Sequence, residues 1–264
     1  LTPGSDYNDV YNLLPQACTS LVGTAGIVAA DCTQVSKAVT ATEMNLLPTI
    51  ITAVPVSATC PAGQTKTVLF SDDLETSSAN WQTSTGGWYY SPTNYDFPSS
   101  GQDALWGDDA FGASTWTAVE QKNGVALTAT GVNAYYLHFA QAFDTINLND
   151  GGVVEYSIDN GTTWLPTDAL AVVNGPTGTL TGAGNPLLGR AAFTGLSHGY
   201  QNTRYTLTSL AGKTVRFRFR MGLDSNNSSA SSTAYSLGWY LDDVSIYRCA
   251  LTLNNKIFVP TVMK

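Results

Sequence analysis

The sequence predicts a mainly β protein in which a β-sandwich follows a small N-terminal helical hairpin, and three observations lead to this class. From Cys60 onward, at least eight short apolar segments alternate with turns rich in Gly, Asn and Asp, as they do in β-sandwiches. Residues 5–44 instead carry apolar side chains at helical spacing. The chain has 264 residues, 43% of them apolar, which is enough for one large β domain with an appendage.

The helical hairpin is expected to consist of two helices, over residues 5–22 and 29–44. Each has apolar side chains that recur every three or four residues, so each has one apolar face. These residues are Val10, Leu13, Leu14, Ala17 and Leu21 in the first helix and Cys32, Val35, Ala38 and Val39 in the second. Two such helices bury too little surface to be stable alone, so the hairpin needs a partner surface.

The ends of the first helix carry recognisable signals. Ser5 or Asp6 can cap its first turn, and Gly23 can end it. Pro15 lies in its middle and predicts a kink, because proline lacks the N–H that the helix needs there.

Two extended segments are expected on either side of the sandwich. The hairpin occupies residues 1–46, and residues 47–59 form a linker with two prolines and no charge that should lie on another surface. The sandwich spans residues 60–249. The tail, residues 250–264, contains the apolar run Ile257–Val259, which would promote aggregation if left in water. We therefore expect the tail to dock, either on its own chain or as an added strand on a neighbouring molecule.

Two local patterns support the strands of the sandwich. The first is a strict alternation of arginine and apolar residues, which predicts one face in water and one in the core. Its residues are Val215, Arg216, Phe217, Arg218, Phe219 and Arg220. The second pattern is SIDNGTTW, in which Asn160 and Gly161 predict the turn of a β-hairpin.

The four cysteines predict disulfides and not a metal site. They form no CxxC pair, and the chain has two histidines, so zinc is not expected. Four cysteines allow three pairings. We favour Cys18 with Cys32 and Cys60 with Cys249, because each pair then brackets one structural unit. Disulfides indicate an oxidising compartment, so we expect a secreted, extracellular protein.

Composition excludes two classes of function. The net charge is −8 and only 12% of residues are charged, which argues against the basic surface that nucleic-acid binding requires. No apolar run is long enough to span a membrane. The first residues have neither the basic region nor the apolar run of a signal peptide, and no Met, so we expect a processed or truncated product.

Two parts of the chain resemble known families. Residues 1–44, LTPGSDYNDVYNLLPQACTSLVGTAGIVAADCTQVSKAVTATEM, resemble the last helices of thermolysin-like (M4) metallopeptidases, with Cys32 as a departure that would add a disulfide. The zinc-binding HExxH helix of that family lies upstream of this point, and the chain contains no such motif. His138 and His198 are isolated, and we expect a strand residue and a loop residue, respectively.

The sandwich is similar to the jelly-roll domains appended to immune-inhibitor-A-like metallopeptidases, which are distantly similar to MAM and galactose-binding-like domains. The matching blocks are LFSDDLE with Trp81, LWGDDAF, GGVVEYSIDNGTTW, NPLLGRAAFTG, LAGKTVRFRFRMGLDS and GWYLDDVSI. The resemblance implies a jelly-roll β-sandwich that is not catalytic and often holds a structural calcium ion.

Five acidic residues are candidate calcium ligands. Three acidic stretches lie at the start of the sandwich, in an early loop and in its last strand, and first and last strands of jelly rolls are often neighbours. If the stretches converge, they supply the carboxylate oxygens that calcium prefers. The candidates are Glu75, Asp108, Asp109, Asp242 and Asp243. The alternative is that these acids cap turns and accept backbone N–H bonds. A glycosidase-type acid pair is disfavoured, because no carboxyl here has a reason for a raised pKa.

Aromatic residues between positions 88 and 106 are candidates for a binding surface. Exposed rings in a polar loop can stack on sugars or contact proteins, or else they cover the open edge of the sandwich. The candidates are Trp88, Tyr89, Tyr90, Tyr95 and Trp106, with Phe97 in the same stretch.

Together, these features predict a non-catalytic C-terminal portion of a secreted metallopeptidase. Its jelly roll would be stabilised by calcium and would bind substrate or a surface, either carbohydrate or protein. The alternative is a structural or adhesive protein that assembles into a polymer, with copies of itself as partners. A stand-alone peptidase is disfavoured, since neither zinc ligands nor an activated nucleophile can be found in the sequence.

Overall fold

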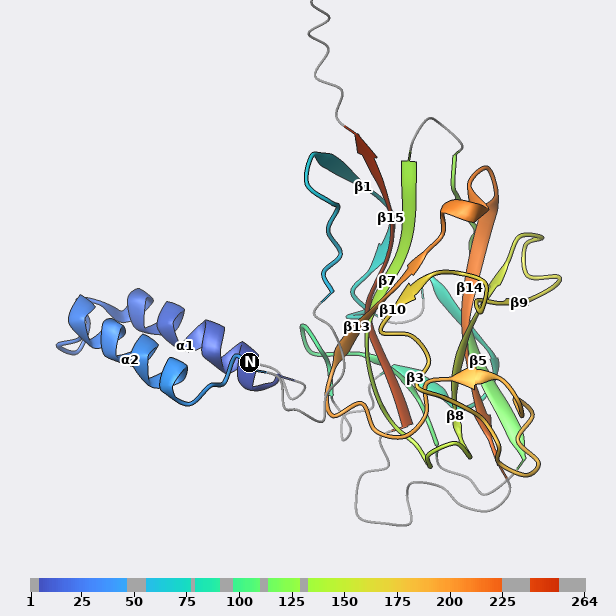
Figure 1. The fold of residues 1–264 in the computed structure, drawn as a ribbon, viewed down its shortest axis with the longest axis horizontal. Helices are drawn as coiled ribbons and strands as arrows, with labels where there is room; N and C mark the ends of the chain where they lie inside the picture. The colour runs from blue at the N-terminus through green and yellow to red at the C-terminus, as the bar shows by residue number, and fades with distance from the viewer. Residues whose placement is uncertain are drawn as a thin grey trace, which may run out of the picture.

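The computed structural model describes residues 5–46, 56–76, 79–90, 97–109, 114–128, 133–224 and 238–251. These residues form a helical hairpin and a β-sandwich of two antiparallel sheets, which confirms the predicted fold class (Figure 1). The predicted tail residues Ile257–Val259 and most of the predicted linker lie outside the described residues.

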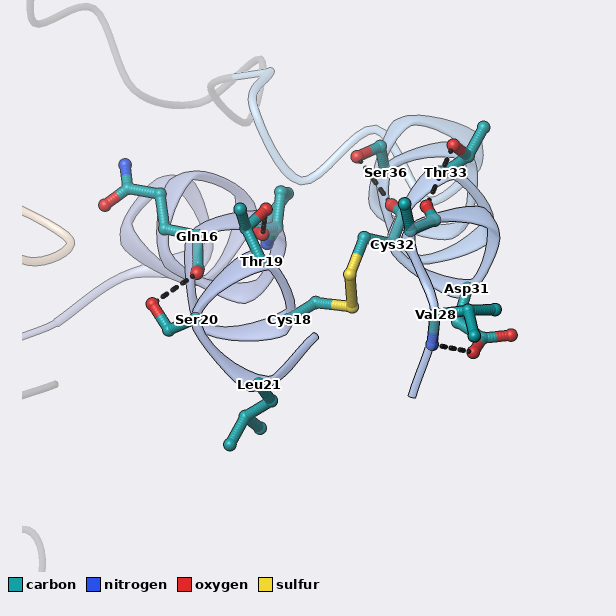
Figure 2. The surroundings of a disulfide bond; sticks show 12 residues. Gln16, Cys18, Thr19, Ser20, Leu21, Val28, Asp31, Cys32, Thr33 and Ser36 are labelled. Carbon is teal, nitrogen blue, oxygen red and sulfur yellow. Dashed lines mark hydrogen bonds between the residues drawn. A yellow bond between two sulfur atoms is a disulfide. The ribbon is translucent and has the colours of Figure 1, made fainter. Parts of the chain in front are cut away.

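The hairpin consists of α1 (Tyr7–Leu21) and α2 (Ala29–Ala41), close to the predicted spans. Asp6 caps α1: its carboxylate accepts the N–H of Asp9, and the Asp9 carboxylate accepts the N–H of Asp6. The helix runs through Pro15. The predicted disulfide between Cys18 and Cys32 is present and joins the two helices (Figure 2).

The hairpin has almost no core of its own. No residue of α1 is buried, and Val39 is the single buried residue of α2. The disulfide closes a short loop, which stabilises by about 3 kcal/mol in the chain-entropy model. The hairpin therefore depends on this covalent bond and on helix contacts that leave most of its apolar side chains exposed.

The first sheet has the strand order β10-β13-β7-β15-β4-β3, and β1 also pairs with β15. Its strands are β1 (Gln64–Asp72), β3 (Trp88–Tyr90), β4 (Leu105–Gly107), β7 (Asn133–Asp144), β10 (Val172–Val173), β13 (Gln201–Thr206) and β15 (Gly238–Leu251). First and last strands of the sandwich are thus neighbours, as predicted. The predicted disulfide between Cys60 and Cys249 lies beside this pairing and links the residues just before β1 to the end of β15.

The second sheet has the order β2-β5-β14-β8-β9, with β6 also paired to β14. Its strands are β2 (Trp81–Thr85), β5 (Thr115–Gln121), β6 (Val125–Ala126), β8 (Gly151–Ser157), β9 (Leu165–Pro166) and β14 (Thr214–Leu223). A small separate sheet joins β11 (Gly178–Thr179) to β12 (Ala191–Ala192), and a 3₁₀ helix, η1, covers Thr208–Leu210. The predicted turn at Asn160 and Gly161 lies between β8 and β9, and both residues have positive φ, as such turns require.

The core lies between the two sheets and is rich in aromatic rings. Trp239 of β15 is fully buried and contacts the rings of Trp88, Phe193 and Phe219. Its indole N–H donates to the Gln141 side chain at 2.8 Å, so the polar atom of this buried ring is satisfied. Because β15 contributes to the core and pairs with β7, β4 and β1, it is the central strand of the first sheet.

The last residues of the predicted linker lie on the outer face of the first sheet. The carbonyl of Val56 lies 3.3 Å from Nε2 of His138, which is on β7, and the carbonyl of Thr59 accepts a hydrogen bond from Tyr247. His138 is 5% exposed, and burial lowers its pKa. It is a buried strand residue, as expected, and His198 is an exposed loop residue.

Candidate functional site

The acidic residues of the last strand lie where β15 changes partners. One edge of β15 pairs with β4 over Trp239–Leu241 and with β1 over Val244–Leu251. Between these two stretches, the pairing of β15 with β7 on its other edge shifts register, and Asp243 has a φ of 49°. A bulge of this kind re-aims side chains and leaves backbone groups without ladder partners. We call the residues around it the junction: Asp73 and Glu75 after β1, Ser99–Asp103 before β4, and Asp242 and Asp243.

Asp242 anchors the loop that precedes β4. Its Oδ2 accepts the backbone N–H groups of Ser99 at 2.8 Å and Ser100 at 3.0 Å, and its Oδ1 accepts the N–H of Asp243. The side chain is fully buried, and no residue within the described ranges forms an ion pair with it. Burial raises the pKa of Asp242 to about 7, so the expectation that no carboxyl here has a raised pKa was wrong. The nearby Asp243 charge adds to the rise, although hydrogen bonds from Ser99 and Ser100 oppose it.

Glu75 holds the same loop from the side of β1. Both of its carboxylate oxygens accept the N–H of Gln102, at 3.0 and 2.9 Å, and one accepts the N–H of Asp103. The intervening Gly101 has a φ of +58°, and a Cβ at this position would overlap the Glu75 carboxylate. A glycine is therefore required for the loop to close over the carboxylate.

Asp243 completes the junction. Its Oδ1 accepts the Ser100 hydroxyl at 3.1 Å. Burial raises its pKa, the hydrogen bond from Ser100 lowers it, and the charges of Asp73 and Glu75 raise it further. The junction thus gathers the carboxylates of Asp73, Glu75, Asp242 and Asp243, with Asp103 in the loop between them. Among the described residues, no cation forms an ion pair with these four carboxylates.

A cleft of about 560 Å³ opens beside the junction on the outer face of the first sheet. Asp72, Asp73 and Asp243 line it, together with His138. Asp72 has a structural role, because its carboxylate accepts the side-chain N–H groups of Asn80 and Trp81. The cleft is polar and acidic, so it suits a cationic or hydroxyl-rich ligand better than an apolar one.

Two of the five candidate calcium ligands lie elsewhere. Asp108 and Asp109 follow the other end of β4, where the N–H of Asp108 donates to Gly87 and Asp109 lies beside Gly238. From Gly238 to Asp242 is four residues, or roughly 13 Å along the strand. The structure therefore brings Glu75, Asp242 and Asp243 together and adds Asp73, which sequence reasoning did not single out although it lies within the recognised stretch LFSDDLE.

The side chains of the described residues do not form a ready-made metal site. No group of three or more His, Cys, Asp or Glu residues within the described ranges is arranged to hold a metal ion. At the junction, the reason is visible: the oxygens of Asp242 and Glu75 already accept backbone N–H bonds. Nor, among the described helices, is any long and apolar enough to cross a membrane.

The candidate aromatic residues divide between two faces of the first sheet. Trp88 is buried in the core against Trp239, and Tyr90 packs on the same core. Trp106 is buried on the outer face and stacks on Tyr240. Tyr89 is 46% exposed and contacts Trp106. Tyr95 lies outside the described residues, and Phe97 stacks on Tyr200 as part of the outer cluster. Among the described candidates, only Tyr89 offers a ring to solvent.

The face of β14 that was expected in water is largely covered. The side chains of Arg216, Arg218 and Arg220 are only 9–17% exposed, because carboxylates and indole rings lie over them. Sequence alternation identified the face correctly but not what packs on it.

No protein-family model and no curated protein matches the chain. Among solved structures, the K2 cleaved adhesin domain of Lys-gingipain is 16% identical, with a TM-score of 0.38, and the match covers 67% of this chain and 96% of that one. The CBM22-1 xylan-binding domain of Paenibacillus barcinonensis Xyn10C is 12% identical, with a TM-score of 0.38 and coverage of 70% and 96%. The carbohydrate-binding module CBM6cm-2 of Cellvibrio mixtus lichenase 5A is also 12% identical, with a TM-score of 0.33 and coverage of 68% and 97%. Likenesses this distant carry no argument about the ligand, and the fold rests on the strand pairing described above.

Proposed function

We propose that the chain is a non-catalytic extracellular binding module that forms the C-terminal portion of a secreted metallopeptidase. The observation that carries the proposal is the exposure of the helical hairpin. Its apolar side chains are 41–54% exposed at Leu13, Leu14, Leu21, Val22 and Val28. A helix pair with this much exposed apolar surface is expected to belong to a larger packed unit.

The hairpin resembles the last helices of M4 peptidases, and this resemblance indicates that the larger packed unit is a peptidase catalytic domain. In this proposal, a catalytic domain upstream covers the apolar hairpin, and the sandwich is carried behind it. The two disulfides suit the extracellular location, because they persist in oxidising compartments.

The junction is proposed to bind calcium as a structural ion. Asp73 and Asp243 would hold it, together with backbone carbonyls, because the oxygens of Asp242 and Glu75 are engaged by N–H donors. The raised pKa values of Asp242 and Asp243 support a cation there, since a divalent ion would offset the charge that the protein does not balance.

The test is recovery of the natural protein from culture medium with an antibody against this chain. We expect a zinc-containing species larger than the 28.0 kDa of the chain, with chelator-sensitive caseinolysis that the pure 264-residue chain lacks. A 28.0 kDa species without an attached peptidase would contradict the proposal.

The second candidate function is an extracellular structural protein that assembles from copies of itself. It is favoured by β1, which pairs on one edge with β15 and has no partner strand on its other edge within the described ranges. An open edge can accept a strand from a neighbouring molecule. Deletion of residues 252–264, followed by sizing and negative-stain microscopy, tests whether the tail supplies that strand. A chain that is monomeric both with and without the tail rules this candidate out.

A further inference from the structure

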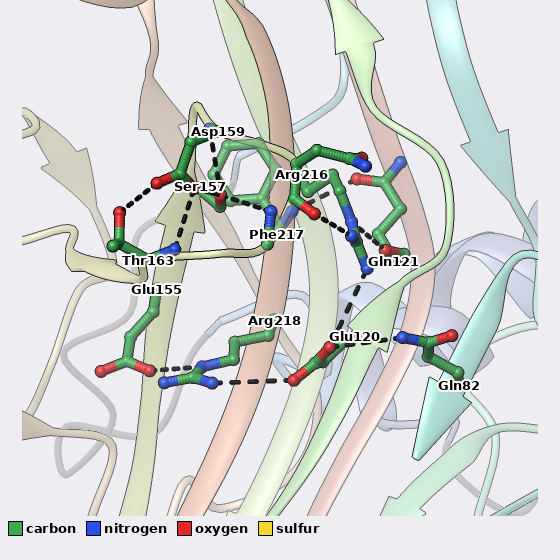
Figure 3. A network of polar contacts seen from close by, with 12 residues as sticks. Gln82, Glu120, Gln121, Glu155, Ser157, Asp159, Thr163, Arg216, Phe217 and Arg218 are labelled. Carbon is green, nitrogen blue, oxygen red and sulfur yellow. Dashed lines mark hydrogen bonds and ion pairs between the residues drawn. The ribbon is translucent and has the colours of Figure 1, made fainter. Parts of the chain in front are cut away.

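The outer face of the second sheet carries a network of charged side chains far from the junction. We call it the arginine face, and Figure 3 shows its centre, where Arg218 lies between two carboxylates. Its members are Glu120 of β5, Glu155 of β8, Arg216, Arg218 and Arg220 of β14, and Arg190 from the loop before β12.

The arginine face has an excess of positive charge. Four guanidinium groups share two carboxylates, which leaves two positive charges in a chain whose net charge is −8. Glu155 is approached by Arg218 at 2.6 Å, by Arg190 at 2.9 Å and by Arg220 at 3.9 Å. One carboxylate therefore cannot balance the three cations around it.

The four arginines are not equally satisfied. Arg216 donates to the carbonyls of Gln121 at 2.7 Å and Asn160 at 2.6 Å, and Arg218 lies between both glutamates. By contrast, Nε of Arg220 and both Nε and Nη2 of Arg190 are buried without a hydrogen-bond partner within the described ranges. Burial lowers the pKa of Arg220, Glu155 raises it, and Arg218 and Arg190 lower it further. Arg190 and Arg220 thus keep N–H groups without an acceptor, although both lie beside the Glu155 carboxylate.

Two partly buried indole rings flank this row of arginines. The ring of Trp116 packs against the guanidinium of Arg220 at 4.4 Å, and the ring of Trp164 packs against Arg218 at 4.6 Å and Arg216 at 5.8 Å. From Arg216 to Arg220 is four residues, or roughly 13 Å along β14. An extended ligand that follows β14 would meet an indole, a row of guanidinium groups and a second indole.

We propose that the arginine face binds a chain of carboxylate-bearing sugars. A ligand carboxylate would lie between Arg190 and Arg220, where a planar acceptor matches the planar guanidinium groups. The sugar rings would pack on the exposed sides of Trp116 and Trp164, since indole rings suit surfaces that are apolar on one side and wet on the other. An acidic peptide is less suited, because the face lies in the middle of a sheet and offers no free edge for strand pairing. This inference rests on the proposed binding function and names its ligand class.

The test is calorimetric titration of the full chain with oligogalacturonate and with oligomannuronate. Neutral galactan oligosaccharides and poly-glutamate serve as comparison ligands. The variant Arg220→Gln removes the unsatisfied cation, and Trp116→Ala removes one ring. The matched control is Arg204→Gln, which removes an arginine that lies over Tyr136 on the other sheet. Thermal unfolding of each variant confirms that it is folded.

We expect at least one uronate to bind. The substitution Arg220→Gln should weaken its affinity on the order of ten- to a hundredfold, as for a lost charged hydrogen bond. Trp116→Ala should weaken binding too, whereas Arg204→Gln should not. Uronates also chelate calcium, so they could bind through an ion at the junction. The variant Arg220→Gln leaves the junction intact, so loss of binding in this variant places the ligand on the second sheet. This result is independent of whether the chain belongs to a peptidase or responds to calcium.

Three results would overturn the inference. One is failure of both uronates to bind the folded parent chain. Another is equal binding of neutral galactan, which would make the arginines irrelevant. The third is equal or tighter binding of poly-glutamate with the same loss in Arg220→Gln, which would make the arginine face a site for acidic peptides.

Discussion

The junction and the arginine face balance buried carboxylates by different means. Asp242 is surrounded by backbone N–H groups, and its pKa is nevertheless raised to about 7 by burial. Glu155 is buried as well, but the hydrogen bond from Arg190 and the charge of Arg218 outweigh the effect of burial, and its pKa is lowered. Backbone dipoles hold a carboxylate in place without fully replacing the water that it has lost, whereas guanidinium groups replace that water.

The comparison explains why the two regions are expected to attract opposite ligands. The junction concentrates negative charge from Asp73, Glu75, Asp242 and Asp243, which favours a cation. The arginine face has more guanidinium groups than carboxylates and favours an anion.

The largest effect is expected from Glu155→Ala, which removes the one carboxylate that three arginines share. Loss of one partner of a buried ion pair leaves uncompensated charge and typically costs about 3–5 kcal/mol. We expect the free energy of unfolding in guanidinium chloride to fall by that amount. A loss below about 1 kcal/mol would mean that Glu155 does not balance the network.

The pH dependence of stability should distinguish the junction. In the folded chain, Asp242 keeps its proton up to a pH of about 7, whereas in the unfolded chain it loses the proton near its ordinary pKa of about 4. Between these values the folded state binds more protons, so the free energy of unfolding falls as the pH rises, by up to a few kcal/mol.

Asp150, whose pKa is raised to about 6 by burial, acts in the same direction, so Asp242 must be isolated by substitution. In chelator, the stability of the parent relative to Asp242→Asn should decline from pH 4 to pH 8. A difference that does not change with pH would show that Asp242 does not titrate as described.

Chelation should lower the melting temperature of the parent if calcium occupies the junction. A ligand at a hundredfold excess over its dissociation constant stabilises by about 2.7 kcal/mol. Asp243→Ala should melt lower in calcium and respond little to chelator, whereas the control Asp168→Ala, an exposed acid in another loop, should respond like the parent. If the parent melts identically with and without chelator, the calcium proposal is wrong.

Sequence reasoning succeeded where a feature is local or follows from the order of the chain. Ser5 or Asp6 was recognisable as the cap of the first helix, and the structure shows that Asp6 is the cap. The turn at Asn160 and Gly161 was recognisable from its two residues. The pairing of Cys60 with Cys249 followed from their positions at the two ends of the sandwich.

Sequence reasoning was incomplete where loops decide which strands meet. Asp108 and Asp109 were candidates to converge with Asp242, but β4 pairs with β15 in a register that places them beside the start of β15. The arginines of β14 were placed on the correct face, but nothing in the alternation reveals that Trp116 and Trp164 cover them. Asp73 joins the junction because the pairing of β1 with β15 ends at Asp72 and Val244, which places Asp73 near Asp243.

The smallest effect is expected from Glu120→Gln, which tests whether the stabilisation by an ion pair of the arginine face depends on the distance between its charged atoms. Glu120 lies 3.6 Å from Arg218 and 3.9 Å from Arg216, longer than the 2.6 Å between Arg218 and Glu155. Both arginines keep other partners in the variant, since Arg216 donates to backbone carbonyls and Arg218 retains Glu155. The loss in free energy of unfolding should therefore stay below about 1 kcal/mol, the range of weak ion pairs. A loss as large as that of Glu155→Ala would mean that the two carboxylates act as one unit. The excess positive charge would then be spread over all four arginines instead of residing at Arg190 and Arg220.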